Sequence, residues 1–125
     1  MKPVRLALLI ACCASAPVQA LEPEAAARSL LAEARSFEHG EGVRRDTARA
    51  AALYCQAAKL GDAEAQFNLA WMYANGRGVD RDDALAATFF DLAARQGHEH
   101  AQRMLRFTGA PTRELPLCMQ DPPEP

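Results

Sequence analysis

Apolar side chains recur at steps of three and four residues along most of the chain, a spacing typical of helices buried along one face. Glycine-containing turns and aspartates interrupt this pattern, because glycine ends a helix and aspartate caps the next one. Five helices are therefore expected, over residues 23–39, 47–60, 63–74, 83–96 and 98–107. Glycine and proline at positions 109, 111 and 116 then interrupt regular structure up to the end of the chain.

The helical pattern repeats with an offset of 36 residues. Two Gly-x-Gly-Val turns begin at Gly40 and Gly76, and Ala65-Gln66 recurs as Ala101-Gln102. A helix pair buries only one of its faces by itself, so repeated pairs must stack to form a continuous core. We predict an all-α fold, an alpha-solenoid of antiparallel helix pairs with about two and a half repeats. The predicted repeats cover 30–65 and 66–101, with a partial capping repeat at 102–109 and an extended, proline-containing tail at 110–125.

The second copy carries a motif that resembles the Sel1-like repeat, a TPR-like helical family. The motif is Ala65-Gln66-x-x-Leu69-Ala70-x-Met72-Tyr73-x-x-Gly76-x-Gly78-Val79-x-x-Asp82-x-x-x-Ala86, followed by Ala93-Ala94-x-x-Gly97-x-x-x-Ala101. The resemblance extends over about residues 30–107, and the first copy departs from it at Glu33-Ala34 and Phe37. It implies a solenoid that serves as an interaction scaffold, and bacterial members of the family are common among envelope and secreted proteins.

The first 20 residues have the features of a secretory signal peptide. Basic Lys2 and Arg5 precede the apolar run 6–11, and Val18-Gln19-Ala20 offers a small-residue cleavage site. The repeat domain is then expected over 21–109, in a periplasmic or secreted protein. An alternative interpretation uses Leu9-Ile10-Ala11-Cys12, which resembles a bacterial lipobox and predicts a lipoprotein anchored at Cys12.

Charge and hydropathy exclude two classes of partner from the prediction. The chain has a formal net charge of −2, and removal of Lys2 and Arg5 with the signal segment makes it −4. A negative chain is not expected to bind nucleic acid. Outside the signal segment, no apolar run approaches the roughly 20 residues that a membrane-spanning helix needs.

Two of the four cysteines, Cys55 and Cys118, remain after signal removal. An exported chain with an even number of cysteines favours a disulfide. We expect Cys55 to face outward from its helix, and the bond to hold the tail across the open end of the solenoid, capped by Leu115, Leu117 and Met119.

The sequence carries no pattern that predicts catalysis, a metal or a cofactor. The two imidazoles of His98-Glu99-His100 lie two residues apart, whereas helical metal ligands need a spacing of three or four, and no third ligand follows. Asp82-Asp83 lies at a helix start, where carboxylates cap the helix and complement its dipole. Cys55 has no base partner, and the serines outside the signal segment lack nucleophile-elbow glycines. We therefore predict that the protein is not an enzyme.

Trp71 is the strongest candidate for a binding residue. With Asn68 and Asn75 it is expected near the concave face of the first helices of the pairs, and repeat proteins bind ligands there. Arg35 and Arg106 should extend this face to the neighbouring helices. The alternative is that Trp71 only packs against the adjacent helix that carries Arg35. Arg77 and Arg81, in the second turn, are interpreted as solvated charges.

Two functions from different classes remain. The first is an exported protein–protein interaction scaffold of the bacterial cell envelope, which binds a partner, such as a peptidoglycan-acting enzyme, through the concave face. The second is a non-catalytic helical arm or split partner of a peptidoglycan lytic transglycosylase. Residues 113–118 are similar to the junction that precedes the catalytic domain in some repeat-containing enzymes of that kind.

Overall fold

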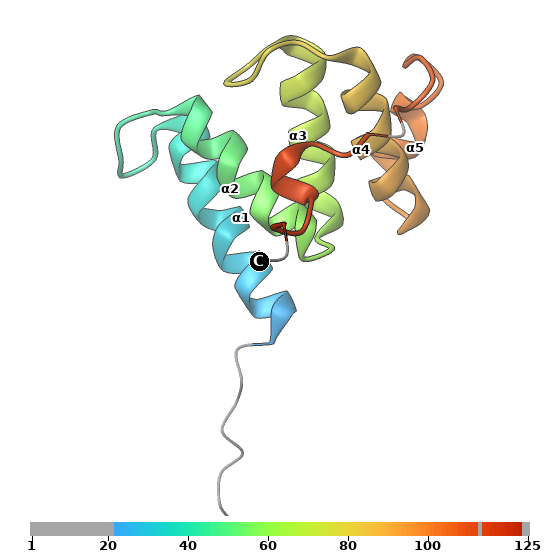
Figure 1. Ribbon diagram of the computed structural model, residues 1–125. Coiled ribbons are helices and arrows are strands. Elements are labelled where there is room, and N and C mark those ends of the chain that lie inside the picture. Colours follow the sequence, from blue (N-terminus) through green and yellow to red (C-terminus); the bar gives the residue numbers. More distant parts are fainter. Residues whose placement is uncertain (1–21, 113, 124–125) are drawn as a thin grey trace, which may run out of the picture.

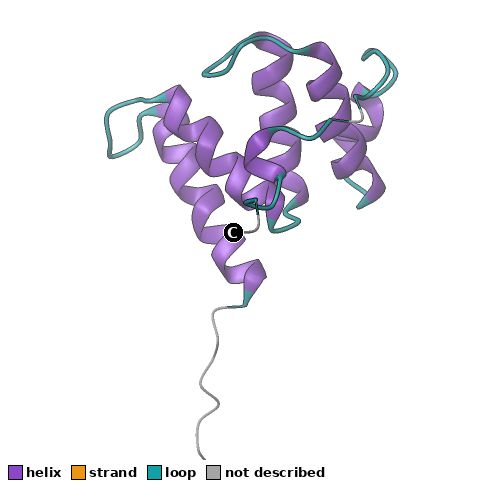
Figure 2. Ribbon diagram, in the orientation of Figure 1, coloured by secondary structure: helices purple, strands orange, loops and turns teal. Residues whose placement is uncertain are grey.

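The computed structural model describes residues 22–112 and 114–123, which form helices and connecting loops without a strand (Figures 1 and 2). The segment 1–20, with the expected signal peptide and the alternative lipid anchor at Cys12, lies outside this range. The elements are α1 (Pro23–His39), α2 (Thr47–Lys59), α3 (Ala63–Asn75), α4 (Asp83–Arg95), α5 (Glu99–Met104) and the 3₁₀ helix η1 (Leu117–Met119). Within the described range, none of the helices is both long and apolar enough to cross a bilayer.

The helices pack as successive pairs. Helix α1 lies against α2 and α3 lies against α4, while contacts between α2 and α3 join the two pairs and α5 packs on α4 (Figure 1). We call α1, α3 and α5 the A helices, and α2 and α4 the B helices. The all-α solenoid with five helices that the sequence predicted is therefore confirmed.

Side chains that cap the helices set their N-termini. The Oδ1 atoms of Asp46, Asp62 and Asp82 accept backbone N–H bonds from Arg49 (3.0 Å), Ala65 (2.8 Å) and Leu85 (2.9 Å). Each bond satisfies one of the backbone donors that a helix start leaves unpaired. Asp46 and Asp82 are related by the 36-residue offset, so the same cap begins both B helices.

Alanines make up most of the core, which lets the helices approach closely. The largest fully buried side chains are Tyr54, Leu69, Met72, Phe89 and Phe90. A glutamine of the repeated Ala-Gln motif closes each junction between repeats. Gln66 Nε2 donates to the Ala58 carbonyl (3.3 Å), and Gln102 Nε2 donates to the Ala94 carbonyl (3.1 Å), the same contact 36 residues later. Each of these carbonyls also accepts the amide of the glycine that follows its helix, Gly61 or Gly97, so the motif glutamine adds a second hydrogen bond that joins the next A helix to the end of the B helix.

The last helix is shorter than predicted. The sequence predicted a helix over 98–107, but α5 ends at Met104. The Arg106 and Phe107 amides donate to the carbonyls of Arg103 (3.3 Å) and Met104 (2.9 Å), which are three-residue bonds that tighten the chain into a 3₁₀-type turn. The described chain supplies no B helix after α5, so packing does not favour a continued helix.

The second glycine turn packs against the first repeat. Gly78 has φ +72°, and a Cβ added there would overlap the Thr47 carbonyl and lie 3.0 Å from the Ala48 nitrogen. The turn after α3 therefore touches the first residues of α2. The equivalent glycine of the first turn, Gly42, has φ +71° and no atom within 4 Å of such a Cβ.

A disulfide joins Cys55 on α2 to Cys118 on η1, with their Cα atoms 6.2 Å apart. Cys55 faces outward from its helix, as expected, and is buried because the tail covers it. The expected route of the tail is wrong, however. The tail does not cap the open end of the solenoid but crosses the B helices, from α4 back to α2 (Figure 1).

Hydrogen bonds and burial explain this route. The Thr112 amide donates to the Ala84 carbonyl of α4 (3.3 Å), and Lys59 Nζ of α2 donates to the Gln120 carbonyl (2.9 Å). Among the three side chains predicted as a cap, Met119 packs against the core, whereas Leu115 is 40% exposed and Leu117 is 85% exposed.

Candidate functional site

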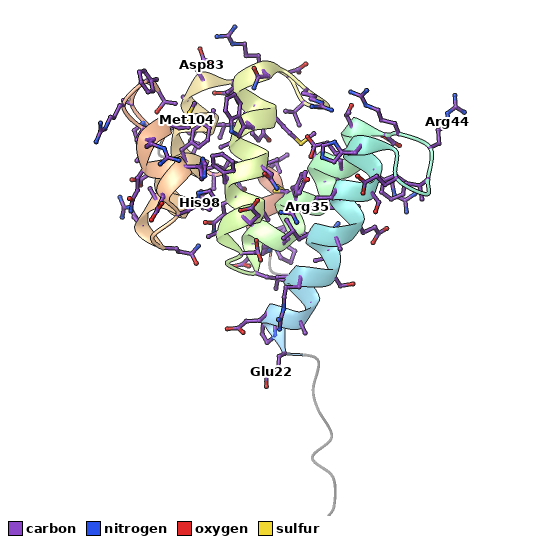
Figure 3. The ribbon with its side chains drawn as sticks, turned by 180° about the vertical axis from the view of Figure 1, so that it is seen from behind. Glu22, Arg35, Arg44, Asp83, His98 and Met104 are labelled. Carbon is purple, nitrogen blue, oxygen red and sulfur yellow. A yellow bond between two sulfur atoms is a disulfide. The ribbon has the colours of Figure 1, made fainter. Side chains whose placement is uncertain are left out.

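A cavity of about 380 Å³ opens between α1 and α3, and we call it the A-helix cavity. Ten residues line it: Arg35, Glu38, His39, Tyr54, Glu64, Asn68, Trp71, Met72, Asn75 and Arg77. They come from the A helices α1 and α3, from Tyr54 of α2 and from the second glycine turn. Arg35 and His98 lie on this side of the molecule, which Figure 3 shows from behind the view of Figure 1.

The structure brings together four of the five residues predicted to bind a partner. Arg35, Asn68, Trp71 and Asn75 all line the A-helix cavity. Arg106 does not line it, because it lies in the turn that replaces the end of α5.

The indole of Trp71 is anchored along one edge and open along another. Its ring makes edge-on contacts with Phe67 (6.4 Å between centroids) and Phe90 (6.2 Å), and the residue remains 41% exposed. Asn75 Nδ2 donates to the backbone carbonyl of Trp71 (2.8 Å), which fixes this amide on α3 in the wall of the same cavity. A held, half-exposed indole next to amides offers both apolar area and hydrogen bonds to a ligand.

Arg77 was interpreted from the sequence as a solvated charge, and the structure places it in the cavity wall instead. Its NH1 lies 3.6 Å from Glu38 Oε1 and its NH2 donates to the Glu38 carbonyl at 3.5 Å. Its Nε is buried and has no hydrogen-bond partner within the described residues. Sequence periodicity could not find this residue, because the turn folds back onto a helix 39 positions earlier.

Glu64 links the three A helices. Its Oε1 accepts a hydrogen bond from Arg35 NH2 on α1 (2.9 Å), and its Oε2 lies 3.0 Å from His98 Nε2 at the start of α5. His98 Nδ1 accepts the Ala101 amide (3.2 Å), so Nε2 carries the proton and donates to Glu64. The histidine ring also stacks on Phe67, with centroids 4.5 Å apart. His98 is thus a helix cap and a structural link.

Tyr54 forms the floor of the cavity. Its side chain is buried, and its hydroxyl donates to Glu38 Oε2 at 2.6 Å. Burial raises the pKa of Tyr54 far above its usual value, and the hydrogen bond to Glu38 raises it further. Burial also raises the pKa of Tyr73, the other tyrosine of the chain.

These shifts predict a delayed tyrosine titration. A phenol whose pKa is raised by folding contributes stability in full below the unfolded pKa of about 10, and this contribution is lost as pH rises above that value. We expect tyrosinate ultraviolet absorbance to appear at higher pH in the folded protein than in the urea-unfolded protein. Coincident titration curves of folded and unfolded protein would contradict the assigned burial.

Tyr54→Phe should lower the free energy of unfolding at neutral pH by about 1.5–3 kcal/mol, as for a hydrogen bond to a charged group.

The chemistry available in the cavity is that of binding. Two arginine–glutamate contacts, two amides and an indole can hold a ligand by hydrogen bonds and apolar contact. Within the described residues, no group of three or more His, Cys, Asp or Glu is placed to hold a metal ion.

Comparison with known proteins identifies relatives of this architecture. The family model described as "Sel1 repeat" matches residues 25–62 and 63–98, which cover α1 from its third residue together with α2, and then α3 with α4. A Sel1 repeat protein from Oxalobacter formigenes is similar in structure, with a TM-score of 0.62 and 30% identity over 70% of each chain. No curated protein gave a significant match.

A second solved structure is similar over a small part of its length. It is a protective antigen, with an SLR fold, that is present in uropathogenic Escherichia coli strains. The TM-score is 0.63 and the identity 33%, over 68% of this chain but only 19% of the antigen. Neither structure is described as a lytic transglycosylase, so the resemblance of residues 113–118 to such an enzyme stays a prediction.

Proposed function

This chain belongs to the Sel1 repeat family, whose members generally serve as protein-interaction scaffolds, and we propose that it is an exported scaffold of the bacterial cell envelope. In this proposal it binds a partner protein through the A-helix cavity and catalyses no reaction. Export is supported by the signal-like segment 1–20, with its positive end and small-residue cleavage site.

The observation that carries the proposal is the joint placement of Arg35, Asn68, Trp71 and Asn75 around one cavity. Tryptophan and arginine are enriched among the residues that dominate binding energy at protein interfaces, because they offer large contact areas together with hydrogen bonds. At 41% exposure, Trp71 has indole surface left to bury against a partner.

The charges of the cavity favour a protein over a polyanion. Arg35 faces Glu64 and Arg77 faces Glu38, so each cation already has a carboxylate within 4 Å. Charges balanced in this way do not create a strong field for phosphate groups or for an anionic polymer. Protein surfaces carry charges of both signs, and such a partner can use each pair as donors and acceptors.

Trp71→Ala tests the proposal, with Val43→Ala as a matched control. Both side chains are 41% exposed, but Val43 lies in the first turn, outside the residues that line the A-helix cavity. We expect purified Trp71→Ala protein to lose at least about tenfold in affinity for a partner captured from envelope extract, as for an interface hot spot. Val43→Ala should retain the affinity, and equal capture by both variants would contradict binding through this cavity.

Intact mass of the protein from a bacterial host tests the export half of the proposal. A chain that begins at Leu21 is expected, whereas a chain that begins at a lipidated Cys12 would place the scaffold on a membrane anchor instead.

A further inference from the structure

The Cys55–Cys118 disulfide has one buried half and one exposed half. Cys55 on α2 is only 3% exposed, whereas Cys118 on η1 is exposed. A thiolate attacks a disulfide along the axis of the S–S bond, from the side opposite the sulfur that leaves, and access decides which sulfur is attacked. Attack on Cys118 Sγ comes from solvent, while attack on Cys55 Sγ would have to come from the side where Cys55 is buried. The structure therefore leaves one of the two sulfurs open to an external thiol.

The contacts of η1 with α2, apart from the disulfide, are weak among the described residues. Lys59 Nζ donates to the Gln120 carbonyl (2.9 Å) and lies 3.4 Å from Asp121 Oδ1, whose side chain is 95% exposed. An ion pair this exposed contributes little to stability. Met119 adds one partly buried side chain packed against the core. The disulfide is thus the main link between this end of the tail and α2.

The chain before η1 is anchored independently of the disulfide. The Thr112 amide donates to the Ala84 carbonyl at 3.3 Å, and Thr88 Oγ1 donates to the Thr112 carbonyl at 3.1 Å. Ala84 and Thr88 both lie on α4, from which the tail runs back to α2 (Figure 1). Opening the disulfide therefore frees the part of the tail around η1, residues 116–123, while Thr112 stays on α4. We call residues 116–123 the strap.

We propose that Cys118 Sγ is a thiol-exchange site, at which an external dithiol opens the Cys55–Cys118 bond and releases the strap from α2 while the helices stay folded. Exposed disulfides are the ones that thiols reduce most readily. The described residues of the strap do not line the A-helix cavity, so the exchange site does not depend on a partner bound there.

The exchange takes place in two steps. A thiolate of the dithiol forms a bond to Cys118 Sγ, and Cys55 leaves as a thiolate that takes a proton from water. The second thiol of the reductant then attacks the sulfur of the first, so Cys118 leaves as a thiolate and is protonated in turn. Two electrons pass to the protein, and the dithiol becomes a disulfide. A monothiol opens the strap only transiently, because Thr112 keeps Cys118 near Cys55, and Cys55 displaces the monothiol again.

The sulfur that is attacked can be mapped with reduced glutathione as the probe. Folded protein that begins at Leu21, and so lacks Cys12 and Cys13, is treated with millimolar glutathione and then with N-ethylmaleimide. Peptide masses should show glutathione on Cys118 and N-ethylmaleimide on Cys55 at least about tenfold more often than the reverse pattern. In urea-unfolded protein both sulfurs are exposed, and the two patterns should be comparable.

Cys118→Ala is the control for this mapping, because it has no bond to exchange and shows how much glutathione reaches Cys55 by other routes. Equal amounts of the two patterns in folded protein, an excess of glutathione on Cys55, or no glutathione adduct above the control would each overturn the proposal.

Reduction by dithiothreitol tests whether the helices stay folded. The rate should be proportional to dithiothreitol concentration and change little in urea below the unfolding midpoint, because attack on Cys118 needs no unfolding. The reduced protein should keep its helical circular dichroism without urea, with changed amide shifts in α2 and in the strap. A rate that reaches a plateau and rises with urea as steeply as unfolding, or a loss of helix on reduction, would show that the bond opens only with the fold.

Discussion

Gly78→Ala will destabilise the protein by about 3 kcal/mol or more, whereas Gly42→Ala will cost roughly 1–2 kcal/mol. The two glycines occupy the same place in the two turns and have nearly the same φ, +72° and +71°. Both substitutions therefore carry the strain of a side chain in left-handed backbone. Only at Gly78 does the new Cβ also overlap the backbone at Thr47. The difference between the two costs measures the contact between the second turn and the first repeat.

Urea denaturation followed by circular dichroism gives both values, with the disulfide intact in each variant. A lower midpoint with an unchanged slope reports lost stability, while a changed slope reports an altered folded or unfolded state. Equal losses for the two variants would mean that the second turn does not rest on α2. Gly78→Ala should also weaken partner binding at the A-helix cavity, because Arg77 in the same turn is displaced from Glu38.

Cys118→Ala will remove about 4 kcal/mol of stability, as expected for a disulfide that joins residues 63 positions apart. The bond acts mainly by restricting the unfolded chain, so its effect grows with the length of the loop it closes. Cys118 is exposed, and replacing it leaves the buried Cys55 in place without a cavity. The variant therefore isolates the loss of the bond.

Two measurements check this expectation. The midpoint of urea unfolding of Cys118→Ala should match that of the reduced wild-type protein, and both should lie well below that of the oxidised protein. Proteases should cut both between residues 109 and 116 sooner, because the tail is no longer tied to α2. In protein that begins at Leu21, and so lacks Cys12 and Cys13, two titratable thiols per unfolded, unreduced chain would show that the bond is absent.

The helical architecture was predictable because the sequence signals that specify it act locally. Aspartates at the starts of three helices and glycines at their ends each act within a few residues. The common 36-residue offset agrees with these local signals. The end of α5 was not predictable in this way. Residues 105–107 still suit a helix by sequence, but the described chain supplies no B helix after α5 for them to pack against.

The tail illustrates a different limit. The cysteine count was enough to pair Cys55 with Cys118, since the other two cysteines, Cys12 and Cys13, lie in the expected signal segment. The route was beyond prediction, because the tail is held by the carbonyls of Thr112 and Gln120. Every residue has such a carbonyl, so these contacts leave no signal in the sequence.

Only part of the lining of the A-helix cavity was predicted from the sequence. Helical spacing placed Arg35, Asn68 and Trp71 on one face, and they share the cavity. Glu38 and Tyr54 were missed because their contact joins two helices of a pair, which helical spacing within one helix does not reveal.

Closing the tail onto α2 changes how the repeats lose structure. In an open array of stacked repeats each unit contacts only its neighbours, so the terminal units can fray without disturbing the rest. Here the Cys55–Cys118 bond encloses the end of α2, the second helix pair and α5 in one covalent ring. The last helix cannot drift away without pulling on the first pair, so local opening at the C-terminal end is suppressed. The two and a half repeats thereby become a single cooperative unit, in which the protection of the α5 amides against hydrogen exchange approaches that of α2.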